Sequence, residues 1–251
     1  MKKYIALLLS ALMVLCLFAG CGTQESETSE PPAAESADPV ETAGAGETEG
    51  GYKFGLTTMG EASFWDAVEE GVLNVMNEGD ELIFVEGEHG NAAGQVVIIE
   101  DFIAQGCDLV FFNPVDADAA TSCLNLLEEA GIPVINFDSA CTDMSTVETF
   151  CATDNYAAGA LGACSAITGA GADVDLYSVN GGPEAKAKML ADGEEGVWRA
   201  TSAQQPIKMG ETICELAYQY LAGEELESEY LIDAFIISPA NIEEYAGSDW
   251  Q

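Results

Sequence analysis

Asp116 and Asp118 are two carboxylates separated by one residue, a spacing that could serve acid–base chemistry. They follow Pro114 at the start of a predicted helix over Ala117–Ala130, where acidic side chains accept hydrogen bonds from free N–H groups. No histidine or activated nucleophile lies near them in the sequence. A calcium loop of the form D-x-[DN]-x-[DN]-G is absent. The pair therefore predicts a helix start and no enzyme.

Cysteine and histidine, the usual ligands of zinc, are not grouped in this sequence. The single histidine is His89, and the eight cysteines form no C-x-x-C pair, so neither a metal nor a metal cofactor is predicted. We expect the body cysteines to be free buried thiols. A bridge between Cys141 and Cys151 is the alternative in an exported protein. The body cysteines are Cys107, Cys123, Cys141, Cys151, Cys164 and Cys214.

The charge of the chain excludes some classes of partner. The sequence has 44 acidic and 7 basic residues, and its formal net charge is -37. Nucleic acid needs clustered Lys and Arg, and this field repels phosphates, so no nucleic-acid partner is predicted. Neutral or cationic ligands fit better. The loops after the predicted strands also lack phosphate-binding glycine patterns, which argues against a nucleotide cofactor.

The N-terminus has the features of an export signal. Lys2 and Lys3 precede an apolar stretch from Tyr4 to Phe18 that is too short for a membrane span. Small residues then lead to Cys21, as in the lipobox of bacterial lipoproteins. We expect a signal over residues 1–21 and a lipid anchor at Cys21, with an ordinary secretory signal as the alternative. Residues 22–51 are rich in Glu, Thr, Ser, Ala, Pro and Gly and predict a disordered acidic tether.

Strand and helix patterns alternate from Tyr52 onward, which predicts an α/β fold with parallel sheets. The runs Leu109–Phe112 and Ile132–Ile135 are continuously apolar, as strands buried on both faces are. The later part predicts a helix over Tyr156–Thr168, a helix over Ile207–Ala222 and a closing strand over Leu231–Ile237. Ligands of such sheets bind beyond the carboxyl ends of the strands.

Several motifs, in this order, resemble the periplasmic sugar-binding proteins of the ribose-binding type, the solute receptors of ABC importers. The segments that carry the resemblance are Phe54–Thr58 with Ser63-Phe64-Trp65, Asn113–Ala119, Gly131–Asp138, Ala152–Asn155 and Ala200–Pro206. Together they extend over most of residues 52–240. The resemblance implies the type I periplasmic-binding fold, with two Rossmann-like lobes that close on a small sugar.

The resemblance also implies domain limits and site residues. The N-terminal lobe would contain residues 52–148 and 205–230, and a shortened C-terminal lobe would contain residues 149–204 and 231–251. Phe64 and Trp65 would form an aromatic platform for the sugar ring, with Asp138, Asn180 and Gln204 as partners of its hydroxyls. The alternatives are that both aromatic residues belong to the core and that Asp138 only caps a turn.

The chain departs from the family in two ways. Ser139 stands where the family commonly has an arginine, and an aromatic, an arginine and an asparagine of the second lobe have no counterpart. Only Gly169–Ala172 joins the helix over Tyr156–Thr168 to the next strand, where the family has further strand–helix units. This predicts an internal deletion, with either a damaged receptor or a smaller lobe as the outcome.

The leading interpretation is a non-enzymatic, lipid-anchored receptor that delivers a small neutral sugar to ABC permease subunits outside the cytoplasm, as a monomer. The alternative is a truncated, degenerate or signalling paralogue that keeps the fold without sugar transport.

Overall fold

The computed structural model describes residues 51–169, 175–245 and 250. The predicted anchor Cys21, the tether and most of the Gly169–Ala172 join lie outside these residues. All described residues belong to one compact unit.

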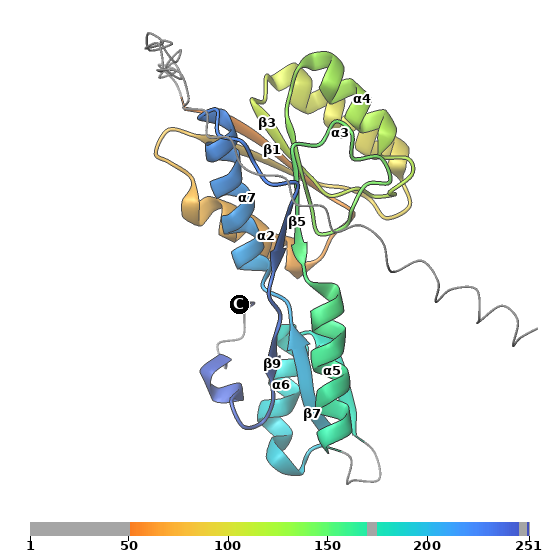
Figure 1. Ribbon diagram of the computed structural model, residues 1–251, viewed down its shortest axis with the longest axis vertical. Helices are drawn as coiled ribbons and strands as arrows, with labels where there is room; N and C mark the ends of the chain where they lie inside the picture. The colour runs from red at the N-terminus through yellow and green to blue at the C-terminus, as the bar shows by residue number, and fades with distance from the viewer. Residues whose placement is uncertain (1–50, 170–174, 246–249, 251) are drawn as a thin grey trace, which may run out of the picture. The chain divides into compact units, whose positions relative to one another are not determined.

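The first sheet is parallel, in the order β2-β1-β3-β4-β5-β8 (Figure 1). This order places β1 and β3 side by side although β2 lies between them in the sequence. Such a reversal of strand order creates a crevice at the carboxyl ends of the strands, where ligands of open α/β sheets bind. The strands are β1 (Lys53–Thr58), β2 (Glu81–Glu86), β3 (Leu109–Phe112), β4 (Val134–Phe137), β5 (Thr149–Thr153) and β8 (Glu229–Ile232).

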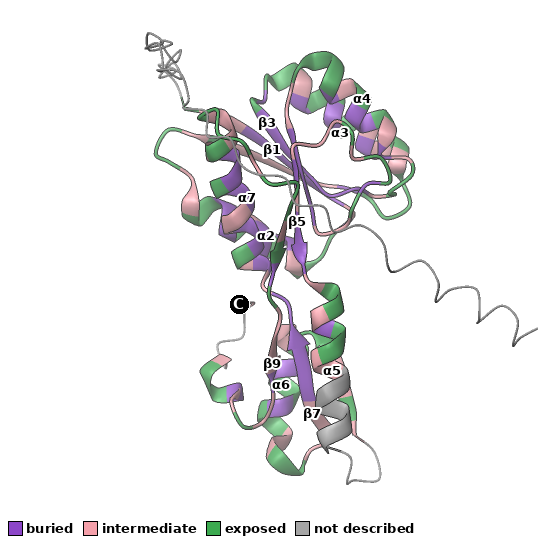
Figure 2. Ribbon diagram, in the orientation of Figure 1, coloured by how far each residue is buried: buried purple, intermediate pink, exposed green. Residues whose placement is uncertain are grey.

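Helices cover both faces of this sheet, as the apolar strands predict. Phe111 of β3 packs with α2 (Ser63–Val75) and α7 (Pro206–Leu221) in one core cluster. Phe112, the next residue, packs with α3 (Ala92–Gln105) and α4 (Thr121–Ala130) in another. The purple central strands of Figure 2 follow from this alternation, because each successive side chain is buried on the opposite face.

The helix predicted over Ala117–Ala130 begins later than expected, at Thr121. The Oδ1 atom of Asp116 accepts hydrogen bonds from the backbone N–H groups of Asp118 at 3.1 Å and Ala119 at 2.8 Å. These bonds hold a turn ahead of the helix. Asp118 accepts a bond of 2.6 Å from Thr142 Oγ1. Both carboxylates therefore have local structural partners.

The second sheet has three strands in the order β6-β7-β9, with α5 (Asn155–Gly169) and α6 (Pro183–Asp192) packed against it. Its strands are β6 (Leu176–Asn180), β7 (Trp198–Ala203) and β9 (Phe235–Ile237). Strands β6 and β7 are parallel, but β9 is antiparallel to β7. The sheet is therefore mixed, whereas the alternating pattern predicted parallel strands only.

The prediction of one closing strand over Leu231–Ile237 is wrong, because β8 and β9 belong to different sheets. Asp233 and Ala234 separate them, and the Gln205 side chain donates a hydrogen bond of 2.7 Å to the Asp233 carbonyl. Strand β5 likewise pairs with β4 in the first sheet, so the change of sheet comes after Thr153 and not at residue 149. The division into two lobes stays a prediction.

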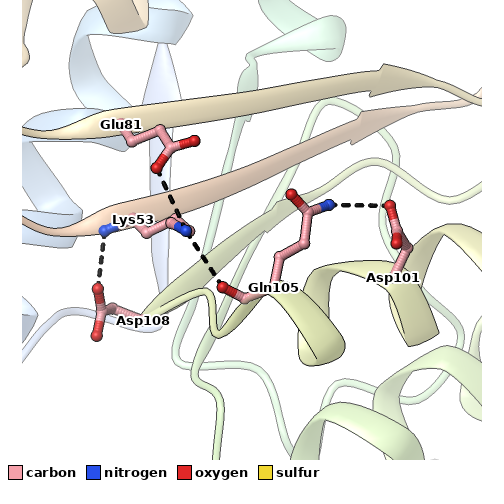
Figure 3. Close-up of polar contacts among 5 residues, drawn as sticks. All are labelled: Lys53, Glu81, Asp101, Gln105 and Asp108. Atoms are coloured by element: carbon pink, nitrogen blue, oxygen red, sulfur yellow. Dashed lines mark hydrogen bonds and ion pairs between the residues drawn. The ribbon is translucent and has the colours of Figure 1, made fainter.

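Lys53 ties the amino end of β1 to its neighbours (Figure 3). Its Nζ atom lies 3.3 Å from a carboxylate oxygen of Glu81 and donates a bond of 3.2 Å to the Gln105 carbonyl. Its backbone N–H donates to Asp108 Oδ2 at 2.7 Å. The pair with Glu81 is largely exposed, so it contributes at most about 1 kcal/mol. This basic residue is therefore engaged far from the carboxyl ends of the strands.

Five cysteines whose side chains are described are free and buried, as the sequence predicts. Cys141 and Cys151 do not form the alternative bridge. Burial raises the pKa of Cys107 and Cys123 to about 11 and that of Cys141, Cys151 and Cys214 to about 12. The side chain of Cys164 lies outside the described part of the chain.

We expect these five thiols to resist alkylation in the native protein. The thiolate is the reactive form, so a pKa raised by two units or more lowers its population about a hundredfold. Iodoacetamide at pH 8, followed by peptide mass spectrometry, should label them only after unfolding in guanidinium. Rapid labelling of Cys151 in the native protein would contradict the buried core described here.

Candidate functional site

One cavity of about 270 Å³ lies at the carboxyl ends of strands from both sheets. It is lined by Ala62, Phe64, Trp65, Asp138, Asn180 and Gln204. All five residues singled out by the sequence resemblance therefore meet in one place. They come from α2, from the residue after β4, from the last residue of β6 and from the residue after β7. The volume fits a small ligand, because pockets for drug-sized ligands usually begin near 300 Å³.

Phe64 and Trp65 stand in the first turn of α2 and have different environments. Trp65 is only 6% exposed, and its ring packs against Phe137 at 6.1 Å in the first core. Phe64 is half-buried, and its ring meets the edge of Trp65 at 4.8 Å. Most of the Trp65 side chain therefore belongs to the hydrophobic core, which was the alternative to a role in binding. Phe64 has more ring surface available to a ligand.

Asp138 follows β4 in a left-handed backbone conformation, with φ of 59°. Its Oδ2 atom accepts hydrogen bonds from Ser139 Oγ at 3.1 Å and from Asn113 Nδ2 at 3.5 Å. Burial raises the pKa of the Asp138 carboxyl above its ordinary value, while these two bonds act in the opposite direction. Among the described residues the carboxylate accepts no bond from a backbone N–H, so it does not act as the turn cap considered above.

Asn180 and Gln204 bring the second sheet to the cavity. Asn180 ends β6 with φ of 89°, and its carbonyl accepts a bond of 3.1 Å from the Gln204 backbone N–H. Gln204 Nε2 donates to Asn155 Oδ1 at 3.3 Å, which links the start of α5 to the end of β7. The Asn180 side chain is exposed, whereas Gln204 is 9% exposed.

Asp138 and Asn180 are the two non-glycine residues with positive φ in the described ranges. Asp and Asn tolerate this conformation better than most residues, but it still costs energy relative to glycine. Residues held in such conformations cluster at binding and catalytic sites. Their coincidence with two predicted ligand partners supports a function for the cavity.

Two further residues hold the site and were missed by the sequence reasoning. Asn113 is fully buried, accepts from the Met59 N–H at 2.9 Å and donates to the Phe137 carbonyl at 3.1 Å. The Asn113–Ala119 motif was a usable signal for it. Trp250 packs against Phe64 at 5.3 Å and donates to Ser63 Oγ at 3.2 Å. No local pattern pointed to Trp250.

A larger cavity of about 300 Å³ lies at the amino ends of β4 and β5 in the first sheet. Pro133 and Glu148, which precede β4 and β5, line it together with Tyr220 of α7. Tyr220 donates a hydrogen bond of 3.0 Å to Glu148. Because parallel sheets place ligands at the carboxyl ends of their strands, the smaller cavity is the better candidate.

The described residues contain no group of three or more His, Cys, Asp or Glu side chains placed to hold a metal ion. None of the helices in the described ranges is long and apolar enough to cross a membrane. The chemical groups of the cavity lining are two aromatic rings, a carboxylate and two amides. They can pack on an apolar ring face and exchange hydrogen bonds with hydroxyls.

Residues 53–163 match the family model of the periplasmic binding protein domain. This range contains Phe64, Trp65 and Asp138, while Asn180 and Gln204 lie beyond it. The chain is also 26% identical over 125 residues to the ribose import binding protein RbsB of Bacillus subtilis (strain 168). That match covers 49% of this chain and 40% of the relative's length.

Solved structures with the same fold include ABC transporter solute-binding proteins. One from Bacillus halodurans C-125, with bound myo-inositol, is 17% identical with a TM-score of 0.63, covering 81% of this chain and 100% of its own. One from Mycobacterium smegmatis, with bound glycerol, is 18% identical and has a TM-score of 0.67. The match covers 79% of this chain and 98% of the Mycobacterium smegmatis chain. At these identities the similarity establishes the type I periplasmic-binding fold.

Proposed function

We propose that this chain, in which residues 53–163 match the periplasmic binding protein domain, is the solute-binding component of an ABC importer and captures a small sugar. The observation that carries the proposal is the convergence of Phe64, Trp65, Asp138, Asn180 and Gln204 on one cavity. Apart from the adjacent pair Phe64 and Trp65, these residues are far apart in the sequence, and the resemblance predicts all five. The relatives with bound myo-inositol and glycerol support a polyhydroxylated ligand.

The cavity has the groups that a sugar requires. The Phe64 ring packs on the apolar C–H face of the sugar, with Trp65 behind it. Asp138 accepts from hydroxyls, while the amides of Asn180 and Gln204 accept and donate. Each sugar hydroxyl loses water on entry, and an unpaired polar group in a buried site costs about 1–3 kcal/mol. Several convergent partners are therefore needed for useful affinity.

The proposal includes the setting of the protein. Anchored through Cys21 outside the cytoplasm, a monomer would present its sugar to the permease subunits of the importer. Its role would be binding and release without chemical change of the sugar. The export signal, the acidic tether and the family match of residues 53–163 support this arrangement.

A thermal unfolding series tests the proposal. The purified full chain is heated alone and with millimolar ribose, xylose, arabinose, glucose, galactose or myo-inositol. A sugar present at 100 times its Kd stabilises the folded protein by about 2.7 kcal/mol, which raises Tm by several degrees. We expect at least one sugar to do so in the wild type and in Glu148→Gln, a control in the other cavity. A Tm that none of these sugars moves would overturn the proposal.

A further inference from the structure

We propose that the preferred ligand is an amino sugar, whose ammonium group pairs with the carboxylate of Asp138. This inference rests on the proposed function and narrows its ligand class. Neutral sugars would enter the same cavity with lower affinity. Three features lead to this conclusion: the partners of Asp138 and the placement of the basic side chains in the described residues, and the net charge of the whole sequence.

Asp138 is held in place by neutral donors only. The hydroxyl of Ser139 and the amide of Asn113 both donate to Oδ2, at 3.1 and 3.5 Å. Within the described ranges, Oδ1 has no hydrogen-bond partner, and Asp138 takes part in no ion pair. A partly buried carboxylate is stabilised most by a cation that also donates hydrogen bonds. In this cavity, a cationic group of the ligand can be that partner of the Asp138 carboxylate.

None of the basic side chains in the described part of the body lines the cavity. Four of them pair with acidic partners: Lys53 with Glu81, Lys188 with Asp192, Arg199 with Asp175, and Lys208 with Glu211. Lys186 is buried in α6 and is outside the cavity lining. Among the described residues that line the cavity there is no Lys, Arg or His. An ammonium group on the ligand would therefore meet no like charge at the cavity wall.

The charge of the whole chain acts in the same direction. A formal net charge of -37 produces a negative potential around the protein, which concentrates cations and repels anions. This field does not change the binding of a neutral hexose. For a positively charged hexosamine it raises both the encounter rate and the affinity. The effect decreases with ionic strength because salt screens it.

Isothermal titration of the full chain with matched ligands tests the inference. The pairs are glucose with glucosamine, galactose with galactosamine, and mannose with mannosamine, at pH 6.5 and low salt. N-acetylglucosamine is the control, because it keeps the substituted nitrogen without the charge. A charge-assisted hydrogen bond is about twice as strong as a neutral one, so we expect at least one amine to bind about tenfold tighter than its matched hexose.

Asp138→Asn keeps the shape of the side chain and removes its charge. We expect the tenfold preference to disappear in this variant, while Glu148→Gln retains it. In the wild type the preference should also shrink at 0.5 M salt, a measurement that requires no variant to fold. Equal or weaker binding of every amine would overturn the inference and leave the proposed function intact. If no ligand of either kind binds, both are overturned.

Discussion

Gly71→Ala is expected to lower the free energy of unfolding by about 3 kcal/mol, and Tm by about 10 °C. Gly71 of α2 faces Gly210 of α7 where the two helices are closest. A Cβ atom at Gly71 would lie 2.0 Å from the Ile207 carbonyl oxygen, and one at Gly210 would lie 2.0 Å from the Val68 carbonyl oxygen. The obstacle is backbone, so the helices must separate and loosen the core under Phe54 and Phe111.

Gly159→Ala is the matched control for this prediction. Gly159 is also a helical glycine, in α5, but a Cβ atom there would have open space around it. Alanine is favoured over glycine in helices by about 1 kcal/mol, so this variant should be as stable as the wild type or slightly more stable. Chemical denaturation of both variants measures the difference. A Gly71→Ala protein that unfolds at the wild-type denaturant concentration would contradict the close helix contact.

Phe64→Ala is expected to weaken sugar binding about thirtyfold, which corresponds to about 2 kcal/mol. The variant removes the ring that we place against the apolar face of the sugar. It also removes the edge contacts of that ring with Trp65 and Trp250, so the fold must be checked. Isothermal titration with a sugar that binds the wild type gives the affinity, and circular dichroism reports the fold.

Two controls separate the loss of the ring from general damage. Phe64→Tyr keeps an aromatic face and should retain affinity within a few-fold. Tyr156→Ala removes an aromatic side chain that is 89% exposed and outside the cavity lining, so its affinity should equal that of the wild type. Unchanged binding by a folded Phe64→Ala protein would show that this ring does not contact the sugar.

Much of the first sheet could be predicted from the sequence because its signals are local. The apolar runs Leu109–Phe112 and Ile132–Ile135 predict two buried strands, and in the structure every residue of β3 and β4 is buried. Glycines at the ends of α3 and α4, Gly106 and Gly131, adopt the left-handed conformation that ends a helix. Such patterns report burial and helix ends directly.

The second sheet was predicted less well because its strands depend on tertiary pairing. Nothing in Leu231–Ile237 marks the switch between sheets at Asp233 and Ala234, since the run is apolar on both sides. The antiparallel pairing of β9 with β7 also has no local signal. The predicted internal deletion, at the Gly169–Ala172 join, stays a prediction.

The candidate site was reached by resemblance and not by composition. Asp138 and Asn180 lie 42 positions apart in the sequence, at the carboxyl ends of β4 and β6, which belong to different sheets, and only the tertiary structure brings them to one cavity. Their positive φ angles could not be predicted from residue type, because Asp and Asn also occur in ordinary turns. Trp250 was missed because its contact with Phe64 depends on tertiary structure alone.

We place a small sugar in the cavity between Phe64, Asp138, Asn180 and Gln204. A crystal structure of the protein grown with a saturating sugar from the titration series would show whether a sugar occupies it. We expect density for one sugar ring packed on Phe64, with hydroxyls within 3.2 Å of the Asp138 carboxylate and the two amides. Sugar density beside Glu148 and Tyr220, with the Asp138 cavity empty, would contradict this placement.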